Sequence, residues 1–214
     1  RIRHARLLAT RGRLDEARNQ LHGAASETPD ERLQLAVAEA GLLREAHQLQ
    51  AAFDLLDEKL ATHPEHPELL YESALLAEKL ERFDLLEQRL RKLITLHPEN
   101  AHAYNALGYS FAERGVHLDE ARTLIEKALL LAPGDFSIID SLGWVLFRQG
   151  DLDGALKQLE RAYAGQHDPE IAMHLVEVLE ALGRKEEALR LLRDAREKHP
   201  ASQLLREALK KRAP

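Results

Sequence analysis

The stretch AHAYNALGYSFAERGVHLDEARTLIEKALLLAP, residues 101–133, contains two amphipathic patterns separated by a turn. On both sides of Gly115, small and apolar residues recur three and four positions apart, which is the spacing of one face of an α-helix. Gly115 marks the end of the first helix, because glycine readily adopts the left-handed conformation found at helix ends. Pro133 ends the second helix. The stretch therefore predicts a hairpin of two helices.

The same pattern recurs along the chain with a period near 34 residues. One helix pair of this length cannot bury its apolar face alone, so repeated pairs stack on their neighbours and share a core. The residue that marks the second helix of each unit occurs at Ala17, Ala52, Leu86, Ala121, Ala155 and Ala188. We therefore expect six stacked helix pairs.

We expect these pairs to form one repeat domain over residues 1–212. The first unit lacks part of its first helix, because Arg1 opens the chain within a helical pattern. For this reason we also expect the chain to be a fragment of a longer protein. The predicted units are about residues 1–32 (partial), 33–66, 67–100, 101–135, 136–168 and 169–202, followed by a capping helix at 201–212.

Glycine and proline mark most of the predicted turns. Units two and three carry His47 and Glu81 where the other units have a glycine, and unit four has one extra residue at Val116-His117. Proline at a unit boundary is expected to stop the second helix. The residues predicted to act in this way are Pro29, Pro64, Pro98, Pro133 and Pro200, whereas Pro169 is predicted to open a helix.

The composition favours helices and excludes several classes of function. The chain is rich in charged residues (31%) and poor in aromatic ones (5%), a profile that favours an all-α fold. A formal charge of −6 argues against a nucleic-acid partner, which would require an excess of clustered Lys and Arg. Without cysteine there can be no disulfide and no thiolate metal site. No apolar run approaches the roughly 20 residues that span a bilayer.

The coincidence of period, small-residue positions, turns and terminal prolines resembles the tetratricopeptide repeat family over essentially the whole chain. This resemblance implies an all-α solenoid, a right-handed superhelix of antiparallel helix pairs with a C-terminal capping helix. It also implies that the first helices of the units line a concave groove.

The resemblance further implies which side chains face that groove. An extended peptide or a partner helix would gain contact area from the aromatic rings and a fixed register from the polar groups. The alternative is that Tyr109 and Trp144 pack between neighbouring helices. The sequence argues against a clamp for a C-terminal carboxylate, because the required Lys and Arg are missing from the positions that would carry it. The candidate partner-binding residues are Tyr71, Leu75, Asn105, Tyr109, Asp140, Trp144, Phe147 and Arg148.

A narrower resemblance covers residues 100–200 and includes the blocks NALGY and DSLGWVLFRQGD. These blocks look like the C-terminal repeats of proteobacterial outer-membrane lipoproteins that bind a carboxy-terminal processing protease and bring it substrates. The resemblance implies a protein-binding adaptor in the periplasm, attached to the outer membrane through an anchor upstream of this fragment. The alternative is an assembly scaffold for a polysaccharide-export or pilus machine.

We expect no enzyme activity, no cofactor and no metal site. Paired carboxylates recur at equivalent helix starts, as in Asp119-Glu120. At these positions the helix dipole stabilises negative charge, which indicates a structural role rather than general acid–base chemistry. The His-Pro pairs that begin at His63, His97 and His199 lie at unit ends, which predicts a role as helix C-caps.

Overall fold

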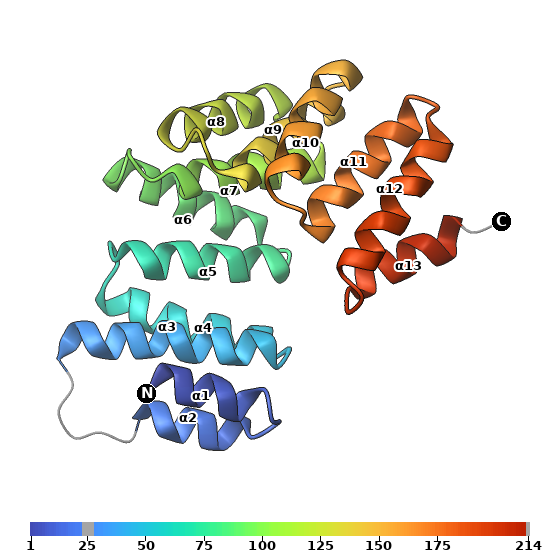
Figure 1. Ribbon diagram of the computed structural model, residues 1–214. Helices are drawn as coiled ribbons and strands as arrows, with labels where there is room; N and C mark the ends of the chain where they lie inside the picture. Colours follow the sequence, from blue (N-terminus) through green and yellow to red (C-terminus); the bar gives the residue numbers. More distant parts are fainter. Residues whose placement is uncertain (23–27, 213–214) are drawn as a thin grey trace. The chain divides into compact units, whose positions relative to one another are not determined.

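The computed structural model describes residues 1–22 and 28–212, and in these ranges every regular element is an α-helix. The helices are α1 (Ile2–Ala9), α2 (Leu14–His22), α3 (Pro29–Glu45), α4 (Leu49–Thr62), α5 (Pro67–Lys79), α6 (Phe83–Leu96), α7 (Ala101–Arg114), α8 (Leu118–Leu131), α9 (Phe136–Arg148), α10 (Leu152–Gly165), α11 (Pro169–Ala181), α12 (Lys185–Lys198) and α13 (Gln203–Arg212) (Figure 1). The all-α prediction is confirmed. In the described ranges, no helix is both long enough and apolar enough to cross a membrane.

The chain divides into two compact units, Arg1–Pro98 and Glu99–Pro214. The first unit holds the pairs α1–α2, α3–α4 and α5–α6, and each pair packs on the next. The second unit holds α7–α8, α9–α10 and α11–α12, with α13 packed against both α11 and α12. The helix pairs and the terminal helix follow the predicted plan, while the grouping of all six pairs in one domain stays a prediction.

The turns inside the pairs share one backbone conformation whether or not a glycine is present. Gly12, Gly115, Gly150 and Gly183 have positive φ, and so do His47 (φ 59°) and Glu81 (φ 58°), which replace glycine in units two and three. A left-handed conformation is unfavourable for residues with a Cβ, so stacking of the pairs imposes it there. His117 (φ 48°) is also left-handed and its ring packs edge-on against Phe111, which accommodates the extra residue of unit four.

The structure confirms one prediction about helix ends and corrects another. His63, His97 and His199 are the C-cap residues of α4, α6 and α12, as their positions before proline indicated. Pro29, in contrast, does not end a helix. It is the first residue of α3, and Thr28 caps that helix in a capping box with Glu31. Proline is favoured at this position because the first helical N–H has no partner within the helix in any case.

Two glycines allow the helices of a pair to approach closely in the second unit. A Cβ on Gly108 would lie 2.8 Å from the carbonyl oxygen of Ala121, and a Cβ on Gly143 would lie 2.6 Å from Cγ of Leu159. The large side chains opposite them, including Ile125 and Leu159, are fully buried. Small residues on one helix and large ones on the other therefore fill the core of each pair.

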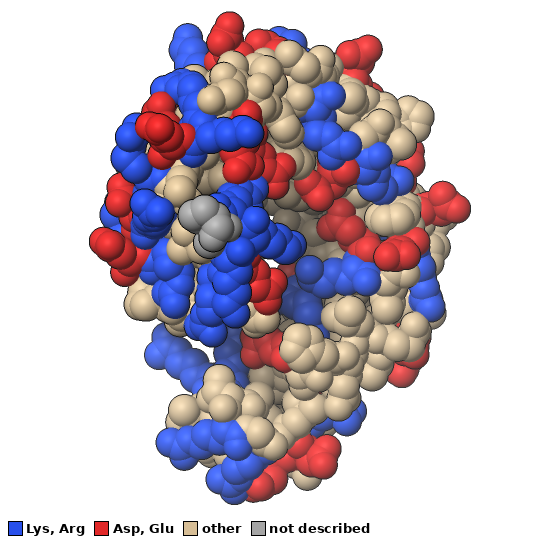
Figure 2. Space-filling model, turned by 90° about the vertical axis from the view of Figure 1, so that its right-hand side faces the viewer, with Lys and Arg blue, Asp and Glu red and all other residues tan. Residues whose placement is uncertain are grey.

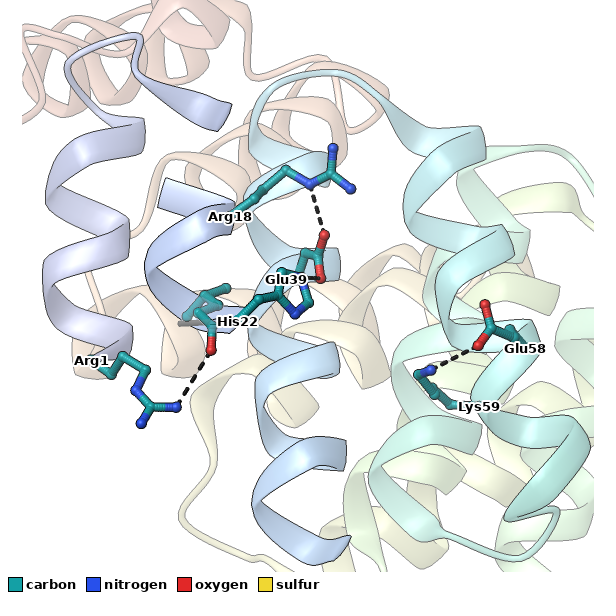
Figure 3. A network of polar contacts seen from close by, with 7 residues as sticks. Arg1, Arg18, His22, Glu39, Glu58 and Lys59 are labelled. Carbon is teal, nitrogen blue, oxygen red and sulfur yellow. Dashed lines mark hydrogen bonds and ion pairs between the residues drawn. The ribbon is translucent and has the colours of Figure 1, made fainter. Parts of the chain in front are cut away.

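A buried carboxylate joins α2 to α3 in the first unit (Figure 3). Glu39 on α3 is only 2% exposed, and its two oxygens lie 2.7 Å from Nε of Arg18 and 2.7 Å from Nε2 of His22, both on α2. A buried charge requires such partners. This ion-pair cluster fixes the first helix pair on the second.

Candidate functional site

The predicted partner-binding residues fall into the two separate units. Tyr71 and Leu75 lie on α5 of the first unit, where both side chains are partly buried. The other six lie on α7 and α9 of the second unit. Leu75, Tyr109 and Trp144 occupy equivalent positions of successive repeats. Because Leu75 lies in the first unit, the candidate site is built on the second unit.

A histidine on α11 connects the aromatic and acidic residues of α7 and α9. His174 Nδ1 lies 2.9 Å from Oδ1 and 3.0 Å from Oδ2 of Asp140, and its Nε2 lies 3.4 Å from the hydroxyl oxygen of Tyr109. The imidazole also stacks on the indole of Trp144, with ring centroids 4.3 Å apart and planes inclined by 21°. Side-chain contacts thus link α7, α9 and α11, the first helices of three successive pairs.

The centre of this cluster is buried and its margin is exposed. Trp144 is 6% exposed, Asp140 7% and His174 9%, whereas Tyr109, Phe147 and Arg148 are partly exposed. The alternative in which Trp144 packs between helices therefore agrees with its burial. A direct contact of Trp144 or Asp140 with a partner stays a prediction.

Two side chains of α9 extend the cluster toward solvent. The ring of Phe147 lies 5.2 Å from that of Trp144, and the guanidinium of Arg148 lies over the indole at 5.9 Å. Arg148 also donates a hydrogen bond of 2.6 Å to the carbonyl oxygen of Glu113 at the end of α7. This bond and the cation–π contact hold Arg148 in place beside Phe147.

The cluster favours positive charge on His174. Burial lowers the pKa of His174, but the hydrogen bond and charge of Asp140, with smaller contributions from Glu113 and Glu177, outweigh it and raise the pKa above the usual value. Burial raises the pKa of Glu177, and the negative charges of Glu113 and Glu180 add to the effect against His174 and Arg212. The surroundings of His174 are therefore rich in carboxylates.

Two of the candidate residues have a buried polar side-chain atom with no hydrogen-bond partner among the described residues. These atoms are Oδ1 of Asn105 on α7 and Nε1 of Trp144 on α9. Buried polar groups in folded proteins are paired in the great majority of cases. One acceptor and one donor on neighbouring first helices are thus buried without a hydrogen-bond partner among the described residues.

Sequence reasoning missed His174. Asp140 and His174 are 34 residues apart, so His174 lies one residue beyond the position on α11 that corresponds to Asp140. Nothing in the repeat pattern distinguishes it from the other ten histidines. Glu177, its neighbour on α11, occupies the repeat position that corresponds to Tyr109 and Trp144. Carrying the groove-facing positions over to the sixth unit would therefore have identified Glu177.

The charged surface is mixed, with one local concentration of cations. In Figure 2, Lys and Arg gather near the C-terminal end of the chain, with Asp and Glu close by. The last turn of α13 supplies Lys210, Lys211 and Arg212, and Arg212 is held by Glu180 of α11 at 2.7 Å. In the part of the chain that the structure describes, no group of three or more His, Asp or Glu side chains has an arrangement that could hold a metal ion.

Family comparisons match three parts of the chain. Models described as tetratricopeptide repeat match residues 1–22, 71–136 and 146–212. Among curated proteins, the TPR repeat-containing protein PA4667 of Pseudomonas aeruginosa is 42% identical over 176 residues, which are 82% of this chain. The chain spans only 30% of the length of that relative.

Solved structures show the same fold. A TPR protein of Thermus thermophilus superposes with a TM-score of 0.77 at 25% identity, covering 84% of this chain and 97% of that one. A tetratricopeptide repeat protein of Parabacteroides merdae also gives a TM-score of 0.77, at 16% identity, covering 99% of this chain and 87% of that one. The chain therefore contains tetratricopeptide repeats and has their fold.

Proposed function

We propose that the chain is a protein-interaction scaffold whose second unit binds a partner protein through the surface formed by Tyr109, Glu113, Phe147, Arg148 and Glu177, here named the α7/α9/α11 surface. The tetratricopeptide-repeat fold supports an interaction role in general. The observation that carries the proposal for this surface is that the partly exposed ring of Phe147 lies against the buried indole of Trp144, which His174 of α11 holds by stacking.

The chemistry of the surface favours a partner with cationic and apolar side chains. The carboxylates of Glu113 and Glu177 have no ion-pair partner among the described residues, and Glu177 is only partly exposed. An Arg or Lys from a partner would relieve the repulsion between them, and Phe147 would supply apolar area beside it. The buried cluster of Asp140, Trp144 and His174 would keep the surface rigid before binding.

We further propose that the partner is a carboxy-terminal processing protease of the bacterial envelope, or a substrate that the chain presents to it. The support for this step is the resemblance of residues 100–200 to lipoprotein adaptors, since the name of the curated relative indicates only the repeat. On this proposal the chain is non-enzymatic and acts by holding two proteins together.

The test measures binding of a purified processing protease to the chain by biolayer interferometry. A double variant Phe147→Ser with Glu177→Lys changes the surface without touching the buried cluster. The matched control is Leu130→Ser with Glu160→Lys, because Leu130 is 80% exposed on α8 and Glu160 is exposed on α10. We expect at least tenfold weaker binding for the first variant only, a loss on the scale of one interface hot spot. Equal affinities of the two variants would contradict the α7/α9/α11 surface, and no binding by the unaltered chain would contradict the protease.

A further inference from the structure

The first unit has a hollow of about 350 Å³ lined mainly by α4 and α6, the second helices of two successive pairs, and here named the α4/α6 hollow. Leu60 of α4, Pro64 after that helix and Leu70 of α5 supply apolar lining. All of the lining residues lie within Arg1–Pro98, and none of them is a candidate partner-binding residue. Sites for small molecules have volumes of about 300–1,000 Å³, so a hollow of this size is large enough for one.

Arg89 places a buried cation in this hollow. The repeat register aligns Arg89 with Leu55, Leu124 and Leu191 of three other repeats, so the packing of a helix pair does not require a cation there. Arg89 is nevertheless only 8% exposed. Burying a charge costs free energy unless partners compensate for the lost water.

Asp57 of α4 compensates for this burial only in part. Arg89 donates one hydrogen bond to Oδ1 of Asp57 and another, of 3.3 Å, to the carbonyl oxygen of Ser73. The side chain of Asp57 is 55% exposed, so solvent weakens the ion pair. Burial lowers the pKa of the Arg89 guanidinium, and the charge and hydrogen bond of Asp57 do not restore it. A guanidinium carries five N–H donors, so Arg89 can serve a further acceptor.

Positive charge predominates around Arg89. Lys92 also lines the hollow, while Asp57 is the only carboxylate among the described residues that line it. Arg82, the N-cap residue of α6, lies two helical turns before Arg89, and both guanidiniums lie 4.7 Å from the centroid of the Phe53 ring. The charge of Arg82 also contributes to the lowered pKa of Arg89. An anion that enters the hollow therefore meets more cations than carboxylates.

We propose that the α4/α6 hollow binds a small monocarboxylate with a short apolar chain. Its carboxylate accepts hydrogen bonds from Arg89, replaces part of the water that this guanidinium lost on burial, and competes with Asp57. Its chain contacts Leu60 and Leu70, where apolar area is removed from water. This site goes beyond the proposed function, because it takes a small molecule rather than a protein and lies in the other unit.

The test titrates the whole chain with sodium hexanoate at constant ionic strength and follows the backbone amides by proton–nitrogen correlation NMR. We expect saturable shifts at amides of α4 and α6, around Asp57 and Arg89. Hexanamide keeps the chain without the charge, and acetate keeps the charge without the chain. Each is expected to bind at least about tenfold more weakly than hexanoate, because the first loses a charged hydrogen bond and the second loses buried apolar area.

Two variants change the cation and its competitor separately. Arg89→Leu introduces the residue that three other repeats carry, so the fold is retained, and hexanoate binding is expected to weaken about tenfold or more. The matched control, Arg193→Leu, removes the same charge from an exposed position of α12 and is expected to leave binding unchanged. Asp57→Asn is expected to strengthen binding about threefold, because it removes the competing carboxylate. Circular dichroism of each variant verifies that the helices remain.

The proposal is overturned if hexanoate causes no saturable shifts in α4 and α6, if hexanamide or acetate binds as tightly, or if Arg89→Leu binds as the unaltered chain does. Weaker binding by Asp57→Asn would also overturn it, since Asp57 would then support the ligand rather than compete with it. Equal affinity for inorganic phosphate would assign the hollow to an inorganic anion. Binding of N-acetylalanyl-leucine about tenfold more tightly than hexanoate would assign it to the end of a polypeptide, and either result would refute a small monocarboxylate.

Discussion

Replacing Asp140 by asparagine should destabilise the second unit in a pH-dependent way. Asparagine has nearly the same shape and can still accept a hydrogen bond from His174 Nδ1, so the change removes mainly the negative charge. Asp140 and His174 are both more than nine-tenths buried, so solvent screens their interaction little. A hydrogen bond to a charged group contributes about 1.5–3 kcal/mol and a neutral one about 0.5–1.5 kcal/mol. We expect a loss of about 2 kcal/mol at pH 6, where His174 carries its proton, and about half of that at pH 9.

The direction in which stability changes with pH follows from the raised pKa of His174. A group whose pKa is higher in the folded state contributes stability that is fully present below its unfolded pKa, and this stability disappears as pH rises through the folded pKa. The unaltered chain should therefore lose stability from about pH 6.5 upward. Glu177 also has a raised pKa, so its contribution has the same sign and begins to be lost as pH rises above its unperturbed value of 4.5. Glu113 is the third carboxylate whose charge acts on His174, beside Asp140 and Glu177.

The assay is urea unfolding followed by the fluorescence of Trp144, the single tryptophan of the chain, at pH 6 and pH 9. Because the indole stacks on His174, its signal reports the unit that carries the pair. Asp57→Asn serves as the control, since Asp57 lies in the first unit. If the unaltered chain were equally stable at both pH values, or if Asp140→Asn lost the same free energy at both, the assignment of a charged His174 held by Asp140 would be refuted.

Three further outcomes are expected. The pKa of His174 measured by NMR titration should lie above 6.5 and should fall in Asp140→Asn; a value below 6.5 in the unaltered chain would contradict the electrostatic argument. Gly108→Ala should destabilise the chain by about 1–3 kcal/mol in thermal or urea unfolding, because the added Cβ would lie 2.8 Å from a backbone oxygen. Gly41→Ala should stabilise it by about 0.5–1 kcal/mol, because a Cβ there meets no atom within 4 Å and alanine favours the helix. The reverse order of stabilities would contradict the packing described for the pairs. Glu39→Gln should cost about 1–2 kcal/mol and loosen α2, detectable as faster amide hydrogen exchange there. The figure lies low in the range for charged hydrogen bonds because Arg18, which donates to Glu39, is substantially exposed.

The fold was predictable because each unit repeats the same helix pair, with small and large buried residues at the same spacing. The spacing of small and large residues predicted the helix pairs, and proline after His63 and His97 predicted where second helices end. Pro29 was misassigned because proline is compatible both with the residues after a helix and with its first turn. The contact of Thr28 with Glu31 decides between the two.

The candidate site was predictable only in part. Register alone placed Tyr109 and Trp144 on the same face of successive first helices, and the structure links both through side chains to His174. The repeat register could not distinguish an exposed ring from a buried one, because the burial of a ring depends on which side chain of the next helix packs on it. Trp144 is buried since His174 covers it, whereas Phe147, three residues later, is partly exposed.

The sequence by itself determined the helices, their pairing and the faces that each pair buries, because these depend on local spacing and on residues within about one repeat. Only the tertiary structure decided the pairing of Asp140 with His174 and the contact of Tyr109 with the same imidazole. These features join residues 34 and 65 positions apart, or helices of three different pairs. The physical reason is that a repeat pattern specifies the average neighbour, whereas charge, burial and open space depend on the individual side chain that each neighbouring unit brings.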